Sequence, residues 1–299
     1  MLPKEYFEDP LTEGVAFGAF EHVLDNRFTL LKLPVGYGKT IIAMQVANRL
    51  ARHGKIQIMI IAPKAKRLDK SFNEAIESCE KYYGLEMKIV KINNQEIGTF
   101  AGLNVMKTRK PELWKEFIEE LKKENTLLIL DETHMQLRDT TKTANQNFRG
   151  IFRTLAEESD KELKILGLTA TPFDMSILDT VGYLVLNGDY TSRNDFYKRE
   201  IVDYEKYLQR GLDMTDINRK IVDQEFRIHF ESFVNKARVL EKISKIIYAP
   251  DAPKNFHIPE NEFEDVKVRL SDEGLEKLAH IEKLDRQKAY LDNTTKCVD

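Results

Sequence analysis

The sequence contains little cysteine, and its two cysteines lie far apart. Cys79 and Cys297 have neither the number nor the spacing that a disulfide framework or a metal site needs. No apolar run approaches the roughly 18 residues that span a bilayer, and the N-terminal residues lack the apolar core of a signal peptide. These absences predict a protein of the reducing cytoplasm that does not work in a membrane.

The chain also lacks a strong excess of charge of either sign. Its formal net charge is −3, with 32% charged and 42% hydrophobic residues among 299. This composition excludes a disordered chain and predicts a globular protein with a core well above the marginal size. The net charge gives no general electrostatic reason to expect nucleic acid as a partner, so that expectation depends on local motifs.

The most informative stretch is a glycine-containing segment that lies between an apolar run and a helical pattern. Residues 28–33 are typical of a buried strand, and residues 41–50 have the apolar spacing of a helix. Glycines between them allow backbone N–H groups to curl around an anion, and the N-terminus of the following helix adds its positive end. The pattern predicts a phosphate-binding loop formed by Gly36, Tyr37, Gly38, Lys39 and Thr40, the residues that would bind the phosphates of a nucleotide.

Two side chains give this loop its expected chemistry. Lys39 would reach the β and γ phosphates, and the hydroxyl of Thr40 would bind Mg²⁺. The full GxxxxGK[ST] pattern begins with a glycine, but Leu33 stands at that position. A chance glycine-rich turn is the alternative interpretation, and the strand and helix on either side argue against it.

Apolar runs and helical patterns alternate along residues 1–186. Such alternation predicts an α/β domain with a doubly wound, mostly parallel sheet, whose ligands bind at the carboxyl ends of the strands. Lys39, Lys64, Asp131 and Thr169 each follow a predicted strand. Helices are expected at 14–24, 68–83 and 111–124, and strands at 56–62, 87–92, 103–108, 126–131 and 163–168.

The pattern changes after residue 186. Residues 187–299 are expected to form a second, mainly helical region, with a long helix at 226–248, a strand at 266–270 and a last helix that begins at Ser271. No catalytic group of residues is evident there, and its aromatic residues have the spacing of a core. We expect a structural role for it.

Two further motifs follow strands of the first region. In Leu130-Asp131-Glu132-Thr133-His134, Asp131 could hold Mg²⁺ and Glu132 could orient or deprotonate the attacking water. An Asp-Glu pair alone is more often an acidic strand end, but a preceding phosphate loop favours the catalytic role. In residues 169–172, two threonine hydroxyls could bond His134 or Glu132, although alone this segment would be an ordinary turn closed by proline.

In sequence order, GYGKT, LDETH and LTATP resemble motifs I, II and III of superfamily-two helicases and translocases. The resemblance implies a RecA-like P-loop NTPase lobe that uses ATP and Mg²⁺. It implies catalytic roles for Lys39, Asp131 and Glu132, and a metal site at Thr40 and Asp131. It also implies that nucleotide state is coupled to movement through His134, Thr169, Ala170 and Thr171.

Other segments extend the resemblance. Residues 60–64 resemble motif Ia, and residues 105–108 lie where the family has motif Ib, which implies nucleic-acid contacts by Pro63, Lys64 and Thr108. Residues 187–197 and 258–271 are similar to the Swi/Snf-like branch. The chain departs from the family in having no Q-motif glutamine before Phe28 and nothing like motifs IV to VI after Thr171. We therefore expect a second RecA-like lobe elsewhere in the full-length chain, and weak hydrolysis by this lobe alone.

The leading functional hypothesis is the first motor lobe of an ATP-dependent helicase or translocase that moves along nucleic acid, DNA rather than RNA. One alternative is a nucleotide-gated nucleic-acid-binding module without useful turnover, against which the presence of Glu132 argues. A P-loop kinase or similar transferase is another, and it would need a pocket for a phosphate acceptor.

Overall fold

The structure is a computed structural model. It describes residues 2, 4–52, 57–63, 71–83, 88–92, 95–123, 126–137, 163–172, 176–202, 204 and 224–250. The chain divides into two compact units, Met1–Lys254 and Asn255–Asp299, and all the described residues belong to the first. The strand expected at 266–270 and the helix expected from Ser271 lie outside the described residues.

A parallel sheet of seven strands forms the centre of the first unit. Its order is β3-β2-β5-β6-β1-β7, and β4 also pairs with β2. Each pairing between these strands is parallel. This arrangement confirms the predicted fold class. The strands are β1 (Phe28–Lys32), β2 (Gln57–Ile61), β3 (Lys88–Ile89), β4 (Ile97–Gly98), β5 (Thr126–Leu130), β6 (Lys164–Thr169) and β7 (Ile247–Tyr248).

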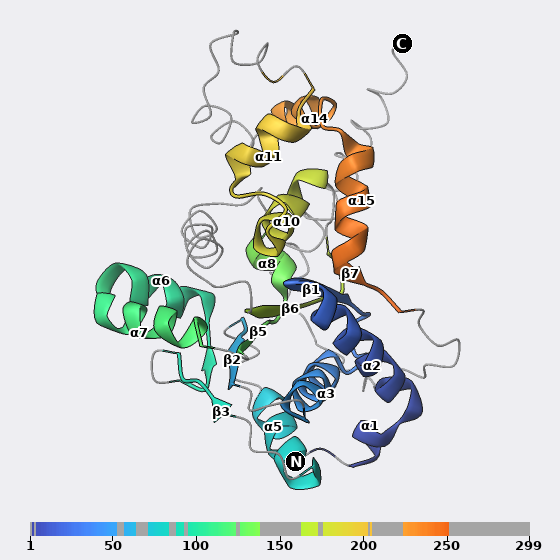
Figure 1. Cartoon of the computed structure of the whole chain (residues 1–299), viewed down its shortest axis with the longest axis vertical. Helices are drawn as coiled ribbons and strands as arrows, with labels where there is room; N and C mark the ends of the chain where they lie inside the picture. The colour runs from blue at the N-terminus through green and yellow to red at the C-terminus, as the bar shows by residue number, and fades with distance from the viewer. Residues whose placement is uncertain are drawn as a thin grey trace, which may run out of the picture. The chain divides into compact units, whose positions relative to one another are not determined.

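Helices lie on both sides of this sheet (Figure 1). The first half of the unit contains α1 (Glu5–Glu8), α2 (Pro10–Asp25), α3 (Lys39–Arg52), α5 (Ser71–Tyr83), α6 (Phe100–Arg109) and α7 (Pro111–Leu121). The second half contains α8 (Thr133–Leu137), the short 3-10 helix η1 (Ile177–Thr180), α10 (Val181–Asn187), α11 (Arg193–Glu200), α14 (Gln224–Glu231) and α15 (Lys236–Ile246).

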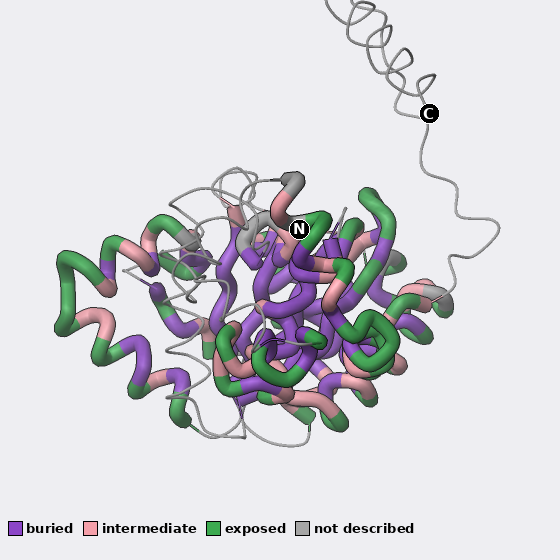
Figure 2. The backbone as a smooth tube through the Cα atoms, turned by 90° about the horizontal axis from the view of Figure 1, so that it is seen from above, coloured by how far each residue is buried: buried purple, intermediate pink, exposed green. Residues whose placement is uncertain are grey.

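Neighbouring residues of the central strands face two different cores. Leu30 packs in a core with α6, α7, α10 and α15, whereas Leu31 packs in a second core with α2, α3 and α5. Because successive side chains of a strand point to opposite faces, a strand covered on both sides must be apolar throughout. This explains the continuous apolar runs in the sequence, and Figure 2 shows buried backbone concentrated in the middle of the unit.

The strand predicted at 103–108 is wrong, because these residues belong to α6. The hydroxyl of Thr99 caps this helix by accepting a hydrogen bond from the backbone N–H of Gly102 at 3.0 Å. Leu103 and Met106 are buried, while Val105 between them is 36% exposed. Burial therefore follows the spacing of a helix and not the alternation of a strand. β4 lies directly before this helix, which begins at Phe100.

The single long helix predicted at 226–248 is also wrong. α14 ends at Glu231, α15 begins at Lys236, and the chain then enters β7. Between the two helices, the backbone N–H of Val202 donates to the carbonyl of Phe233 at 2.8 Å, and the N–H of Asn235 donates to the carbonyl of Glu200 at 2.8 Å. These long-range hydrogen bonds draw residues 232–235 out of the helix, which the local apolar spacing does not reveal.

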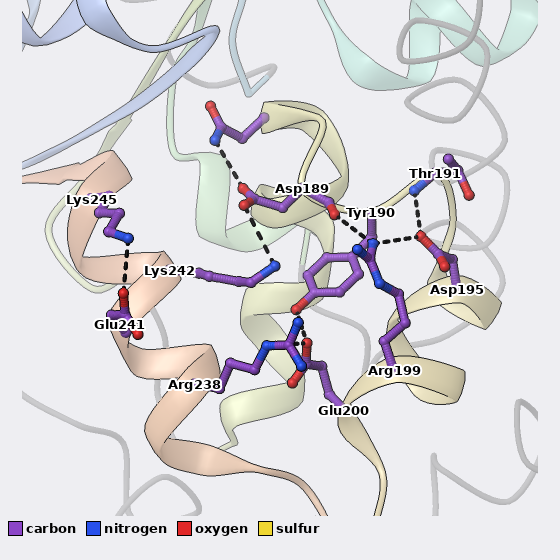
Figure 3. A network of polar contacts seen from close by, with 11 residues as sticks. Asp189, Tyr190, Thr191, Asp195, Arg199, Glu200, Arg238, Glu241, Lys242 and Lys245 are labelled. Atoms are coloured by element: carbon purple, nitrogen blue, oxygen red, sulfur yellow. Dashed lines mark hydrogen bonds and ion pairs between the residues drawn. The ribbon is translucent and has the colours of Figure 1, made fainter.

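A buried polar cluster organises the helical part of the unit (Figure 3). The Tyr190 hydroxyl donates to Glu200 Oε1 at 2.5 Å, and burial, with this hydrogen bond, raises the pKa of the tyrosine. Arg238 Nε lies 3.4 Å from the same carboxylate oxygen, and Lys242 Nζ lies 4.3 Å from the centre of the Tyr190 ring. The cluster shows that this part of the chain is specifically packed. The predicted division at residue 187 stays a prediction.

In the part of the chain that the structure describes, no helix is both long enough and apolar enough to cross a membrane.

Candidate nucleotide and nucleic-acid site

The predicted phosphate loop connects the carboxyl end of β1 to the first residue of α3. Gly36 has φ +81° and Gly38 has φ +72°, and a Cβ at Gly36 would meet no atom within 4 Å. Positive φ values favour glycine, and the open space around Gly36 leaves its backbone accessible. The loop therefore has the backbone that an anion cradle requires, and α3 begins directly behind it.

Lys39 folds back over this loop. Its ammonium nitrogen donates to the carbonyl oxygens of Leu33 at 3.2 Å and Pro34 at 3.0 Å. The lysine is half-buried, as is Thr40 beside it. Both carbonyl acceptors lie at the mouth of the loop, so the ammonium group is already positioned at the place where a bound phosphate would need a positive charge.

Two side chains at this loop, those of Leu33 and Tyr37, are buried in the core. Leu33 stands where the pattern has its first glycine, and its backbone N–H donates to the carbonyl of Thr169 at 3.1 Å. It continues the strand pairing and is buried, so no unusual backbone conformation calls for glycine there. The ring of Tyr37 is buried in the core with α3, and burial raises the pKa of its phenol. Only its backbone lies in the cradle, where its N–H donates to the Pro34 carbonyl at 3.3 Å.

The Asp131-Glu132 pair follows β5 in a strained turn. Glu132 has φ +49°, and it is the one residue other than glycine with a positive φ in the described part of the chain. Its backbone N–H donates to Asp131 Oδ1 at 3.0 Å, while Asp131 is buried and Glu132 is partly exposed. Left-handed backbone conformations of such residues cost on the order of 1 kcal/mol and occur disproportionately at functional sites. The turn therefore leaves the Asp131 carboxylate buried and the Glu132 carboxylate partly exposed.

The predicted coupling residues are brought together. His134 Nδ1 lies 2.7 Å from the hydroxyl oxygen of Thr169 and 3.4 Å from Glu132 Oε2. The same threonine oxygen accepts a hydrogen bond from the backbone N–H of Thr171 at 3.1 Å. Ala170 lies between the two threonines, partly exposed. Close polar contacts thus connect Glu132 through His134 to the segment after β6.

The strand register places all these groups at one edge of the sheet. Lys32 of β1 pairs with Thr169 of β6, and Leu130 of β5 pairs with Gly167. Because neighbouring strands lie about 4.8 Å apart, the ends of β1 and β5 are separated by about 10 Å, with the end of β6 between them. The phosphate loop, the acidic pair and the threonine segment therefore converge on one region, as the sequence predicted.

The oxygen ligands at this edge suit magnesium. A carboxylate at Asp131 and a hydroxyl at Thr40 are hard ligands of the kind that Mg²⁺ binds together with phosphate oxygens and water. In the described residues, no group of three or more His, Cys, Asp or Glu side chains could hold a metal ion without other ligands. Asp131 and Thr40 supply only part of a magnesium coordination shell, so they fit an ion that also takes ligands from a nucleotide and from water.

The predicted nucleic-acid contacts have different outcomes. Pro63 lies just beyond β2 at the same sheet edge and is half-buried, whereas Lys64 lies outside the described residues. Thr108 is on the last turn of α6, where its hydroxyl donates to the carbonyl of Asn104 at 2.8 Å. It is therefore not at a strand end, contrary to the predicted strand. β4 was missed because two residues give no readable pattern, and it brings Thr99 to the edge beside β2.

A comparison with family models identifies the chain. The model described as "Type III restriction enzyme, res subunit" (ResIII) matches residues 15–174, more than half of the chain. The chain belongs to the ResIII family. ResIII membership confirms the resemblance to superfamily-two helicases and assigns a helicase-type ATPase domain to the chain, and the fold confirms its first RecA-like lobe. The matched range contains every predicted site residue.

Among solved structures, this ResIII protein matches one described as "Sulfolobus solfataricus SWI2/SNF2 ATPase core in complex with dsDNA". The two share 18% sequence identity with a TM-score of 0.44, and the match covers 81% of this chain and 44% of the other. The chain thus spans less than half the length of that relative. No curated protein matches it.

Proposed function

We propose that this chain is the first motor lobe of an ATP-dependent DNA helicase or translocase of the Swi/Snf-like branch. The observation that carries the proposal is the convergence of the phosphate loop, the Asp131-Glu132 turn and the Thr169 segment at one edge of the sheet. ResIII membership supports a motor over the other P-loop enzymes, and the naming of that family for a restriction enzyme favours DNA over RNA.

Each group then has a defined task. Gly36, Gly38 and Lys39 bind the phosphates of ATP, and Thr40 and Asp131 would hold Mg²⁺, whose charge would offset the charge that develops on the phosphates. Glu132 orients the attacking water and accepts its proton. The path from Glu132 through His134 to Thr169 and Thr171 reports nucleotide state to the nucleic-acid track, to which Pro63, Lys64 and Thr108 contribute.

The first test replaces the lysine of the cradle. In Lys39→Ala the positive charge at the phosphates is lost, so DNA-stimulated ATP hydrolysis should fall by roughly 10²-fold or more. The matched control is Lys32→Ala, which removes an exposed lysine from the end of β1 and should leave the rate unchanged. The measurement is the steady-state rate of phosphate release by the full-length protein, with its second lobe, in the presence and absence of duplex DNA. Equal rates in the two variants would contradict the assigned role of Lys39.

Glu132 offers a second test that separates function from folding. Glu132→Gln keeps the shape of the side chain and should abolish turnover while nucleotide still binds. Glu132→Gly also removes the carboxylate but relieves the strained φ, so its free energy of unfolding should be equal or higher by up to about 1 kcal/mol. Urea unfolding and ATPase rates measured on both variants check this. If either variant retained full hydrolysis and translocation, the motor assignment would be wrong.

A further inference from the structure

The pair of helices α6 and α7 projects from the side of the sheet as a hairpin (Figure 1). The two helices meet at Lys110, whose backbone N–H donates to the carbonyl of Met106 at 3.0 Å and whose carbonyl accepts from the N–H of Trp114 at 3.0 Å. Met106 and Phe117 anchor the hairpin in the core. The end remote from the sheet, residues 107–115, is called the hairpin tip below.

The hairpin tip carries a concentration of positive charge. Residues 107–115 contain four basic residues and one acidic residue, in a chain of net charge −3. Arg109, Lys110 and Lys115 are all exposed. Neither Arg109 nor Lys115 has an ion pair with any residue that the structure describes. The acidic Glu116 that follows the tip lines a pocket with Lys88 and Lys91, beside β3.

Helix stability does not account for this charge. Basic residues in the last turn of α6, Lys107 and Arg109, complement the negative end of that helix. Lys110 and Lys115 have no such role, since they lie at the start of α7, where the helix end is itself positive. Lys110 occupies the N-cap position of α7 and provides no side-chain cap. A lysine at this position is unfavourable for the isolated helix, and a bound anion would reverse that effect.

The aromatic residue of the hairpin tip is not available for stacking on bases. Trp114 is half-buried, with its ring 5.4 Å from that of Phe117 and the Lys107 ammonium 5.6 Å from its centre. Proteins that bind single strands combine positive charge with open aromatic platforms. Positive charge without such a platform fits the phosphates of a double helix, which are read through charge and spacing alone.

We infer that the hairpin tip binds the phosphate backbone of duplex DNA through Arg109, Lys110 and Lys115. This contact rests on the proposed function and extends it, because it carries the proposed nucleic-acid contact at Thr108 further along the hairpin, away from the edge of the sheet. α6 starts at that edge after Thr99 and has 10 residues, so its far end lies about 15 Å away. The hairpin tip thus holds the duplex on one flank of the motor.

The experiment compares two triple variants of the whole chain. Arg109→Gln, Lys110→Gln and Lys115→Gln neutralise the hairpin tip. The matched control, with Arg52→Gln, Lys4→Gln and Lys81→Gln, neutralises one arginine and two lysines that are exposed on α3, before α1 and on α5. Affinity for duplex DNA, single-stranded DNA and polyglutamate is measured at several salt concentrations. Trp114 is the only tryptophan, so its fluorescence reports directly on the hairpin.

For each lost phosphate contact, the slope of log affinity against log salt concentration should decrease by about 0.9. The slope measured on duplex DNA should therefore be smaller by about 2 to 3 units in the hairpin variant, and this variant should not show the fluorescence change. The control variant should keep the slope and the fluorescence change of the unmodified chain. An unchanged slope, an equal loss in the control, an effect confined to single strands, or equally tight binding of polyglutamate would each overturn the inference. Full-length protein, with its second lobe, that binds duplex DNA through the tip without DNA-stimulated hydrolysis would overturn the proposed function alone.

Discussion

At the scale of single residues, backbone strain and burial distinguish the proposed functional positions from the structural ones. Glu132 keeps a positive φ that glycine would adopt at less cost, and its neighbour Asp131 is a buried carboxylate. A fold selected for stability alone would not place an acidic residue in that conformation. Tyr190 and Glu200 are also buried and polar, but a hydrogen bond from the tyrosine hydroxyl to Glu200 Oε1 joins them to each other, so they maintain structure.

Cys79 provides a residue-scale prediction about reactivity. The thiol is buried within the core around α5, and burial raises its pKa to about 12. Because only the thiolate reacts, Cys79 should resist alkylation at pH 8 to 9 in the folded protein. In a Cys297→Ser variant, iodoacetamide labelling measured by mass spectrometry should be slow without denaturant and rapid in urea. Rapid labelling of the native variant would show that this core opens readily.

The same thiol gives a direction to the pH dependence of stability. The pKa of Cys79 is higher in the folded chain than in the unfolded chain, so ionisation favours unfolding. The contribution of this group to stability is complete below the unfolded pKa of about 8.5 and is lost as the pH rises toward 12.

At the scale of elements, two glycines of α2 differ in whether the structure has room for a side chain at their positions. A Cβ at Gly18 would overlap with the hydroxyl of Tyr248 and lie 2.6 Å from its Cζ, whereas a Cβ at Gly14 would meet nothing within 4 Å. Tyr248 belongs to β7, which pairs with β1 beside α2. Gly18 thus allows the last strand to join the sheet, while Gly14 only lowers the helix propensity of α2.

Alanine at each glycine separates these effects. Gly14→Ala should raise the free energy of unfolding by up to about 1 kcal/mol, because alanine favours the helix. Gly18→Ala should lower it by about 1 to 3 kcal/mol, because Tyr248 must leave its site. Urea unfolding of both variants measures the difference. In a chain that carries Tyr248→Ala the clash is absent, so adding Gly18→Ala should raise the free energy of unfolding. A double variant no more stable than Tyr248→Ala alone would contradict this account.

At the scale of the whole molecule, the described cores determine where the folded unit ends. Both cores draw their described residues from positions up to Tyr248, and the first compact unit ends at Lys254. The chain from 1 to 254 therefore contains both cores, including the strand that completes the sheet. The helices after residue 187 share a core with β1 and β5, so the sheet and this helical part should unfold together.

Truncation tests this prediction. A chain that ends at Lys254 should unfold in a single transition, with a free energy of unfolding within about 0.5 kcal/mol of the value for the same transition in the longer chain. A chain that ends at Ile246 also loses β7 and should be less stable by more than about 1 kcal/mol, because the apolar surface beside β1 is exposed. Calorimetry of the three chains distinguishes these outcomes. Equal destabilisation by both truncations would mean that the folded unit extends beyond Lys254.

The sequence by itself determined the longer strands of the sheet and the placement of the candidate site at their ends. Long apolar runs report strands that are covered on both faces, and each polar motif directly follows such a run, so parallel topology is sufficient to bring Lys39, Asp131 and Thr169 together. These are local patterns, and the carboxyl ends of parallel strands meet without further information.

Tertiary structure alone decided the short elements and the strained turn. β4 and β7 have two residues each and exist because a neighbouring strand pairs with them, and the break between α14 and α15 depends on hydrogen bonds to residues 200–202. Segment 103–108 could alternate as a strand, and the core made it a helix. The positive φ of Glu132 likewise comes from its surroundings. Local propensity is worth only tenths of a kcal/mol per residue, so contacts between distant segments prevail wherever the local pattern is short.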